Sequence, residues 1–167
     1  MNPTNPPSST LTFGTSQDGF RLLNATQWVP RPVEEIFDFF RHPANLGKLT
    51  PPEQKMRILP PFPEVMSPGD VFTYRLQVIG IPLKWKARID SVTPPNSFTD
   101  TMLKGPYRAW IHTHRFESHD NGTLIHDEVR YKIYGCRYGH RWFFKPQLEK
   151  IFSARAKAVA ETFGKPS

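Results

Sequence analysis

The stretch AWIHTHRFESHDNGTLIHDEVRYKI, residues 109–133, decides the fold of this chain. Apolar or aromatic side chains alternate with polar ones on both sides of the segment Asp120-Asn121-Gly122-Thr123. Alternation with a period of two is typical of strands that have one covered face. The Asn-Gly pair favours a tight two-residue turn because both residues tolerate positive φ. The stretch therefore predicts a β-hairpin whose tip is Asn121-Gly122.

This tip fixes a register for the two strands. The first face collects aromatic and aliphatic side chains and the second collects opposite charges, and a slip of one residue would mix the two sets. His112, His114 and Asp127 are therefore predicted to point toward the covered face. The expected cross-strand pairs are Phe116 with Asp127, His114 with Val129, His112 with Tyr131 and Trp110 with Ile133 on the first face, and Arg115 with Glu128, Glu117 with His126 and Thr113 with Arg130 on the second.

Three interpretations of this His/Asp group stay open. A buried histidine–aspartate pair can satisfy its own hydrogen bonds, or the side chains can form the wall of a polar-lined cavity. Either imidazole can also act as a general acid or base, with Asp127 orienting the ring. A metal site would need a third ligand, and the expected register places Asp127 near His114 only on the diagonal, so no metal ligand and no cofactor are assigned. No nucleophile is placed nearby, because the single cysteine, Cys136, falls in a connection.

The rest of the chain predicts an α+β fold. Helical spacing after Pro32 predicts a helix that ends before Pro43, and residues 44–49 predict a second short helical turn. Residues 145–164 predict a long helix with one apolar face. An antiparallel sheet needs a cover for one face, and this long helix is the available cover. The expected strands, besides the two of the hairpin, are residues 20–29, 55–60, 70–79, 82–92 and 97–103.

Several predicted strands carry polar side-chain tips on the face that the helix would cover. Inward positions in the strand at residues 82–92 run from Trp85 to Ser91 at every second residue. A sealed apolar core would hold fewer Tyr, Trp, His and Asp side chains, so the pattern favours a cavity. Arg155, one position beyond the apolar stripe of the helix, can extend outward or reach an internal acid or an anionic ligand. The predicted ligand-binding residues are Tyr74, Trp85, Met102, Trp110, His112, His114, Tyr131, Phe152 and Arg155.

Composition limits the function classes. The chain has 167 residues, of which 38% are hydrophobic and 13% aromatic, and this predicts one domain over residues 19–164 after a flexible Pro- and Ser-rich leader, residues 1–18. No apolar run approaches the ~20 residues of a membrane helix, and the first residues lack the pattern of a secretory signal, so a cytoplasmic protein without stable membrane insertion is expected. The net charge of +7 is spread along the strands, which is typical of a solvated surface, and no nucleic-acid partner is expected. Dinucleotide-binding, phosphate-loop, zinc-protease and serine-hydrolase motifs do not occur in the sequence.

Four segments carry a resemblance to a known superfamily. They are VPRPVEEIFDFFRHPANLGKLTPP (residues 29–52), GPYRAWIHTHRF (residues 105–116), GTLIHDEVRYKI (residues 122–133) and IFSARAKAV (residues 151–159). The chain resembles, over roughly residues 20–163, the START-like or SRPBCC superfamily, which includes Bet v 1-type domains and polyketide cyclase/dehydrase and lipid transport domains. It is most similar to the bacterial ligand-binding branch of unknown function.

The resemblance implies a helix-grip fold. In that fold a seven-stranded curved antiparallel sheet wraps around the long C-terminal helix, two short helices follow the first strand, and an internal cavity lies between sheet and helix. The resemblance also implies that the cavity binds an apolar or amphipathic small molecule, such as a lipid, sterol, polyketide or aromatic compound.

Three functions are considered. The main hypothesis is the binding of a small hydrophobic or amphipathic molecule in the cavity without catalysis. The alternative is a cyclase, dehydratase or hydrolase that uses His112 or His114 as acid or base and Asp127 to orient the ring, which requires an imidazole open to the cavity. The third is binding of nucleic acid or another anionic partner, which requires basic side chains on one contiguous surface together with exposed aromatic residues.

Overall fold

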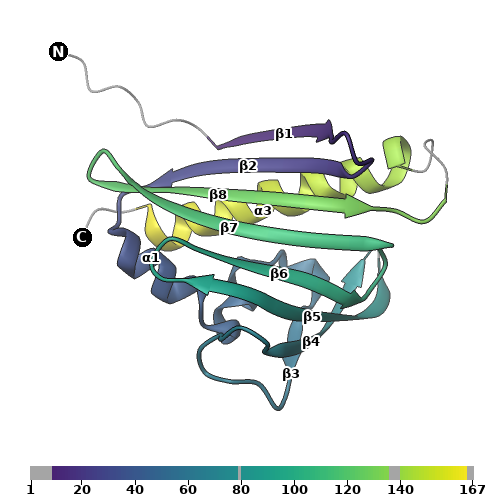
Figure 1. The fold of residues 1–167 in the computed structure, drawn as a ribbon, viewed down its shortest axis with the longest axis horizontal. Coiled ribbons are helices and arrows are strands. Elements are labelled where there is room, and N and C mark those ends of the chain that lie inside the picture. The colour runs from purple at the N-terminus through teal and green to yellow at the C-terminus, as the bar shows by residue number, and fades with distance from the viewer. Residues whose placement is uncertain (1–8, 79, 136–139, 165–167) are drawn as a thin grey trace.

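The computed structural model describes residues 9–78, 80–135 and 140–164. Within these residues the chain forms one eight-stranded antiparallel sheet that curls around a long helix (Figure 1). The strand order is β1-β2-β8-β7-β6-β5-β4-β3. The strands are β1 (Thr10–Thr15), β2 (Arg21–Val29), β3 (Arg57–Leu59), β4 (Val71–Val78), β5 (Ile81–Thr93), β6 (Ser97–Lys104), β7 (Ala109–His119) and β8 (Gly122–Lys132). The helices are α1 (Val33–Phe40) and α3 (Lys145–Phe163), with the short 3₁₀ helices η1 (Pro43–Leu49) and η2 (Pro52–Gln54) and one π-helical turn, η3 (His140–Phe144).

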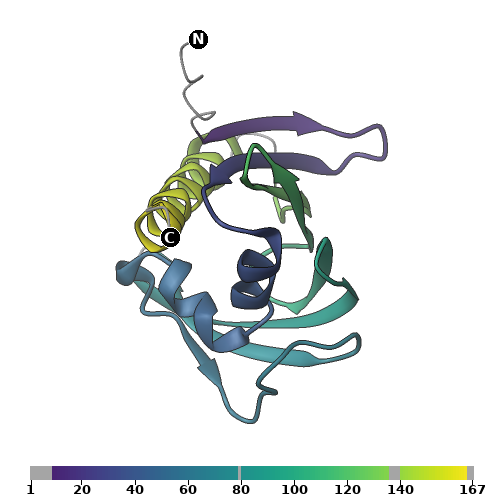
Figure 2. The ribbon, with the colours of Figure 1, turned by 90° about the vertical axis from the view of Figure 1, so that its left-hand side faces the viewer.

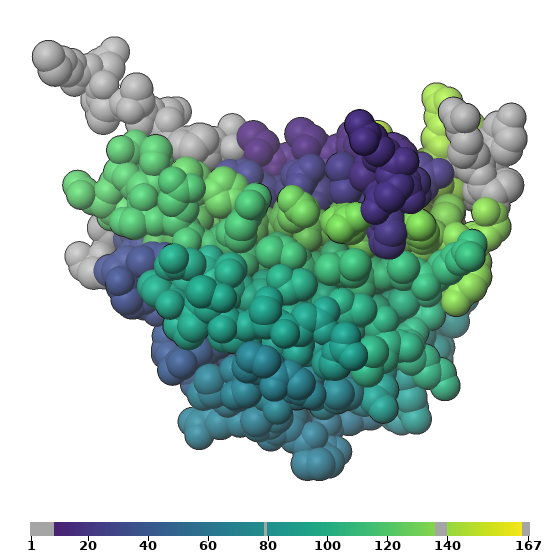
Figure 3. All heavy atoms as spheres, in the orientation of Figure 1, coloured from purple at the N-terminus to yellow at the C-terminus, as the bar shows by residue number. Residues whose placement is uncertain are grey.

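The helices cover the concave face of the sheet. Helix α3 runs along this face, and α1 and η1 lie across the end of the curled sheet that faces the viewer in Figure 2. Figure 3 shows the convex face, where the side chains of β5 to β8 face the viewer and α3 lies mostly behind them. The buried side chains of α1 and α3 recur at helical spacing, as expected for helices with one covered face. They are Ile36, Phe37 and Phe40 in α1, and Leu148, Phe152, Val159 and Phe163 in α3.

Two apolar clusters lie at opposite ends of β7. One joins α1 and the end of α3 to Phe116, and the other joins the start of α3 to Trp110 and Tyr131. His112 and His114 lie between them on the same face of β7, and both side chains are buried. The covered face is therefore apolar at its ends and polar in its middle.

The sheet has eight strands where seven were expected. The additional strand β1 lies in the segment that was predicted to be a flexible leader, and it pairs with β2 from Thr10↔Thr26 to Thr15↔Arg21. Its two larger apolar side chains, Leu11 and Phe13, are half-buried against the cluster that contains Tyr131. The burial of these two side chains stabilises the pairing of the short segment with the edge of the sheet.

The final hairpin has the predicted faces but a different register. Its two-residue loop is Asp120-Asn121, with φ values of 46° and 57°, and His119 pairs with Gly122. The prediction of a tip at Asn121-Gly122 was wrong because Asp120 also adopts the left-handed conformation that a type I′ turn requires. The strands are therefore shifted by two residues, which keeps every side chain on its predicted face.

The corrected register changes the partners of the covered face. Asp127 pairs directly with His114 rather than with Phe116, and the other pairs on this face are Phe116 with Ile125, His112 with Val129 and Trp110 with Tyr131. The predicted diagonal relation between Asp127 and His114 was therefore wrong. The two side chains face each other across the strands, which brings the carboxyl group into contact with the imidazole.

Ser91 does not point toward the covered face as predicted. Strand β5 carries a β-bulge between Ile89 and Ser91, so Ser91 is exposed and Val92, not Ser91, turns toward the core. Cys136, expected in a connection, lies outside the described residues. Among the described residues, no helix is both long enough and apolar enough to cross a membrane.

Candidate functional site

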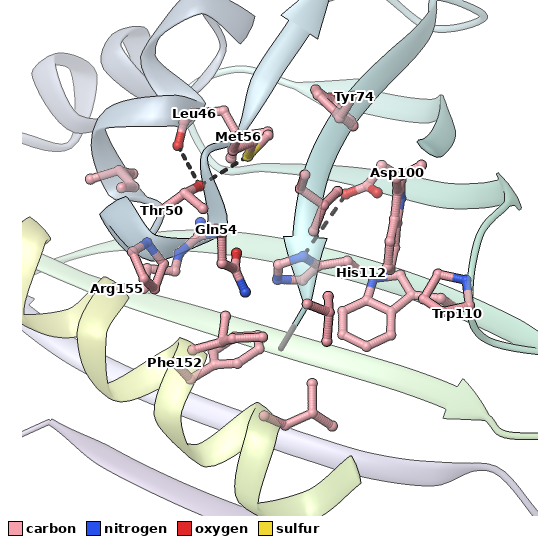
Figure 4. A pocket seen from close by; sticks show the side chains of 18 of the residues that line it. Leu46, Thr50, Gln54, Met56, Tyr74, Asp100, Trp110, His112, Phe152 and Arg155 are labelled. Carbon is pink, nitrogen blue, oxygen red and sulfur yellow. Dashed lines mark hydrogen bonds and ion pairs between the residues drawn. The ribbon is translucent and has the colours of Figure 1, made fainter. Parts of the chain in front are cut away.

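A cavity of about 370 Å³ lies between the concave face of the sheet and α3. Strands β4 to β7 provide one wall, and α3, the end of α1 and the helices η1 and η2 provide the others. Figure 4 shows polar side chains of the lining, among them Gln54, Tyr74, Asp100, His112 and Arg155. Much of the remaining lining is apolar, including Leu46, Met56, Leu76, Leu83, Leu148 and Ile151.

Most of the predicted ligand-binding residues line this cavity, and two do not. Tyr131 is fully buried behind the lining, where its hydroxyl oxygen lies 2.7 Å from Nε2 of His140. Met102 is half-buried against the cluster of Trp110 and Tyr131 and lies close to Gly105. The seven lining residues are Tyr74, Trp85, Trp110, His112, His114, Phe152 and Arg155.

A polar cluster joins β7, β8 and α3 at the cavity wall. Oδ1 of Asp127 lies 3.1 Å from Nε2 of His112 and 2.6 Å from Nδ1 of His114. On the other side of the same carboxyl group, Nε of Arg155 lies 3.6 Å from Oδ2. The guanidinium also lies over the ring of Phe40, and the imidazole of His114 stacks on Phe98. One carboxyl group therefore contacts two imidazoles and one guanidinium, in a site with aromatic walls.

The charges of this cluster follow from its surroundings. Burial alone would raise the pKa of Asp127, but the Arg155 guanidinium and the two imidazoles hold this pKa well below its usual range. Burial lowers the pKa of His114 to about 3, and the neighbouring His112 acts in the same direction. At neutral pH the cluster therefore contains an ionised carboxylate, an ionised guanidinium and a neutral His114 ring.

A second carboxyl group, Asp100, faces His112 from β6. Asp100 pairs with His112 across the sheet, and its Oδ2 lies 4.0 Å from Nδ1 of His112. Burial raises the pKa of Asp100 to about 6, although His112 and Arg155 act in the opposite direction. Burial also raises the pKa of the Tyr74 hydroxyl above its usual value, with a smaller contribution from Asp100. Tyr74 therefore keeps its proton and can donate a hydrogen bond within the cavity.

Sequence reasoning did not assign Asp100 or Gln54 to the site. Gln54 in η2 is only 6% exposed, lines the cavity, and its Nε2 has no hydrogen-bond partner among the described residues. Figure 4 shows its side chain extending into the space near His112 and Phe152. The η2 helix packs against β4, and the carboxylate of its Glu53 lies 3.1 Å from Nζ of Lys150 in α3. Asp100 could have been predicted, because it lies two residues from Phe98 and from Met102 on the same face of its strand. No local sequence pattern predicts the position of Gln54.

A second, smaller cavity of about 90 Å³ lies on the other side of the cluster. It is bordered by β1, β2 and α3, and Asp127 contributes to its wall. Phe40, Phe152 and Arg155 line both cavities. The polar cluster and its aromatic neighbours therefore separate two spaces inside the same fold.

The geometry supports two kinds of chemistry. An apolar cavity with a few convergent polar groups is the usual form of a small-molecule site. An imidazole that is oriented by a carboxylate can also transfer a proton to or from a molecule in the cavity. His112 and His114 both line the cavity, although the exposed fraction of their surface is only 7% and 4%, respectively.

Comparison with protein families gives a match over most of the chain. The profile of the family described as polyketide cyclase / dehydrase and lipid transport matches residues 29–160. No curated protein sequence gives a significant match.

Several solved structures share the fold at low sequence identity. Protein Ms6760 from Mycobacterium smegmatis has a TM-score of 0.67 at 18% identity, covering 92% of this chain and 97% of that one. Major latex-like protein 151 from Panax ginseng has a TM-score of 0.66 at 11% identity, covering 85% of this chain and 96% of that one. A nucleoside-diphosphate sugar epimerase from Corynebacterium glutamicum has a TM-score of 0.55 at 23% identity, covering 80% of this chain but 28% of its own length. At these identities the similarity shows the fold alone.

These matches confirm the resemblance to the START-like superfamily and the helix-grip fold, with the strand count corrected to eight. The family profile covers well over half of the residues. The chain therefore belongs to the polyketide cyclase / dehydrase and lipid transport family.

Proposed function

We propose that this protein binds a small hydrophobic or amphipathic molecule, such as a lipid, polyketide or aromatic compound, in the internal cavity without catalysing a reaction, in the cytoplasm. The observation that carries the proposal is the cavity of about 370 Å³, whose lining is largely apolar and includes a few polar groups. This volume falls within the range of about 300–1,000 Å³ that is typical of small-molecule sites.

The polar groups suggest which part of the ligand they would bind. The buried Nε2 of Gln54 has no hydrogen-bond partner among the described residues, and burial of an unpaired amide group costs about 1–3 kcal/mol. A carbonyl or carboxylate oxygen of a ligand would remove this cost by accepting that hydrogen bond. Tyr74 would add a second donor, and its ring and that of Trp85 would pack against the apolar part. We therefore expect a ligand with an apolar body and one oxygen-bearing end.

The test is saturable binding of the amphipathic fluorescent probe anilinonaphthalene sulfonate, with Leu76→Trp as the blocking variant. Leu76 is a half-buried lining residue of β4, so a larger ring would occupy cavity space. We expect the wild-type protein to bind the probe with one-to-one stoichiometry and Leu76→Trp to weaken binding by roughly tenfold or more, equivalent to about 1.4 kcal/mol. Fluorescence titration measures both values.

The matched control is Arg75→Trp, which places the same ring on the exposed face of the same strand. This variant should bind the probe as the wild-type protein does. Native mass spectrometry after incubation with a total lipid extract provides a second measurement, in which wild type and Arg75→Trp should retain organic molecules that Leu76→Trp does not. A folded wild-type protein that neither binds the probe nor retains any organic molecule would refute the proposal.

An acid/base enzyme is the second candidate, favoured by the contact between Nε2 of His112 and the Asp127 carboxylate. A carboxylate in this position orients the ring and stabilises its protonated form during proton transfer. If the protein is a cyclase, dehydratase or hydrolase, molecules from the extract will change in mass during incubation with the wild-type protein and remain unchanged with His112→Gln. Recovery of every bound molecule with its original mass supports the non-catalytic function.

A further inference from the structure

One oxygen atom, Oδ1 of Asp127, faces a ring nitrogen of each histidine. It lies 3.1 Å from Nε2 of His112 and 2.6 Å from Nδ1 of His114. Because a carboxylate can only accept hydrogen bonds, both of these ring nitrogens must donate. The guanidinium of Arg155 also lies 3.4 Å from Nδ1 of His114. Because a guanidinium has no acceptor atom, it cannot accept the hydrogen of Nδ1–H.

In a neutral imidazole, a nitrogen that donates to Asp127 leaves the lone pair on the other ring nitrogen. In His112 it is Nδ1, and in His114 it is Nε2. Among the described residues, neither nitrogen makes a hydrogen bond. Oδ2 of Asp100 lies 4.0 Å from Nδ1 of His112, which is too far for a hydrogen bond. Asp100, His112 and His114 each offer a carboxylate oxygen or a ring nitrogen, and one such atom from each residue lies within 4.8 Å of the other two.

We propose that Asp100, His112 and His114 bind a divalent first-row transition metal ion, Zn²⁺ or Fe²⁺, with Asp127 and Arg155 as the supporting groups that orient both imidazoles. Two imidazoles and one carboxylate are a ligand set that suits these ions. Histidines that bind a metal usually donate their other ring N–H to a carboxylate or a carbonyl, and Asp127 provides this contact to both rings. The proposal goes beyond the proposed function, because it assigns a site to an inorganic ion.

The distances require only a small closure of the site. Ligand atoms of a tetrahedral zinc ion lie at about 2.0–2.2 Å from the metal, and hence roughly 3.3 Å from one another. The 4.0 Å separation between Oδ2 of Asp100 and Nδ1 of His112 would shorten by roughly 0.7 Å, and a separation at the 4.8 Å limit would shorten by roughly 1.5 Å. The two carboxylates of Asp100 and Asp127 and the one guanidinium of Arg155 together carry a net charge of about −1. This net negative charge favours the binding of a divalent cation.

The register of the hairpin explains why this site was not predicted. With Asp127 considered only as a diagonal neighbour of His114, the two histidines lacked a third ligand. In the structure Asp127 is the orienting group, and the third ligand comes from β6. All three proposed ligands line the large cavity, so water or the oxygen-bearing end of a bound molecule can occupy the remaining position on the metal.

The experiment uses the untagged full chain after treatment with a chelator. Co²⁺ is titrated with visible absorption as the readout, and Zn²⁺ is titrated by calorimetry. We expect one equivalent of each ion, with Kd of about 1 μM or lower, and d–d bands typical of four- or five-coordinate Co²⁺. Asp100→Asn should weaken binding by about tenfold or more, and Asp127→Asn, which removes no ligand atom, should weaken it about 10–100-fold.

His126→Asn is the matched control, because His126 lies on the opposite face of β8, where its Nδ1 contacts Thr26. This variant should bind both ions as the wild-type protein does. Circular dichroism establishes that each variant is folded. Absence of saturable one-to-one binding to the folded wild-type protein, or an affinity lost in His126→Asn but retained in Asp100→Asn, overturns the proposal. Metal titrations contain no organic ligand and the fluorescent probe is tested on chelated protein, so the two proposals can fail separately.

Discussion

Replacing Arg155 with methionine is expected to destabilise the protein by about 3–5 kcal/mol, because the Asp127 carboxylate would stay buried without its cation. Nε of Arg155 lies 3.6 Å from Oδ2 of Asp127, and only 13% and 10% of the two side chains are exposed. Methionine keeps a long flexible side chain at the position, so the change removes the charge without a large loss of packing. Urea denaturation at pH 7 measures the free energy of unfolding.

The matched control is Arg130→Met, which breaks an exposed ion pair. Arg130 and Asp18 are 38% and 54% exposed, so this loss should be much smaller than that of Arg155→Met. The double variant Arg155→Met/Asp127→Asn should recover part of the stability lost in Arg155→Met, because no charge is then buried alone. Equal small losses at Arg155 and Arg130 would contradict the buried ion pair.

A second large effect is expected from Gly122→Ala, at about 2 kcal/mol or more of lost stability. Gly122 begins β8, and a Cβ atom there would overlap the carbonyl oxygen of Val29 and lie 2.7 Å from the ring of Trp28. Neither neighbour is free to move. Val29 is buried in a sheet strand, and Nε1 of Trp28 donates a hydrogen bond to the carbonyl of His119 at 3.0 Å. Thermal and urea unfolding of the variant measure the loss.

Gly14→Ala is the comparison for this substitution. Gly14 also lies in a strand, but its nearest neighbour to a new Cβ would be Leu22 at 3.8 Å, an ordinary contact. The change should therefore be neutral or slightly stabilising, because alanine has less backbone entropy to lose than glycine. If both substitutions have the same effect, steric overlap at Gly122 does not limit stability.

The alternation of side chains in the hairpin predicted the two faces correctly, but the sequence did not predict which residues pair across the strands. Which face a side chain occupies depends only on the parity of the residue number, and the two-residue shift preserved this parity for His112, His114 and Asp127. The pairing itself depends on which two residues form the loop. Asp120 and Asn121 both tolerate the left-handed conformation, so the Asn-Gly pattern alone could not distinguish the two loops.

Two parts of the structure depend on contacts that no local pattern encodes. Strand β1 is short, and besides its pairing with β2 its half-buried Leu11 and Phe13 pack against a cluster that contains Tyr131 and Leu148. Gln54 lines the cavity from η2, which packs against β4 and is linked to α3 by the ion pair of Glu53 and Lys150. By contrast, strand periodicity predicted that Trp85 and Trp110 point toward the covered face, and both side chains line the cavity.

The aromatic partition between the two cavities has a consequence for the length of molecule that such a scaffold can hold. Phe152 belongs to both linings, and it projects from the helix rather than from the sheet. A small residue at this position would remove one of the three side chains that both linings share, and so enlarge the space beside α3 while leaving the strands unchanged. Related chains could therefore lengthen or shorten their chamber through one helical side chain, without rebuilding the fold that surrounds it.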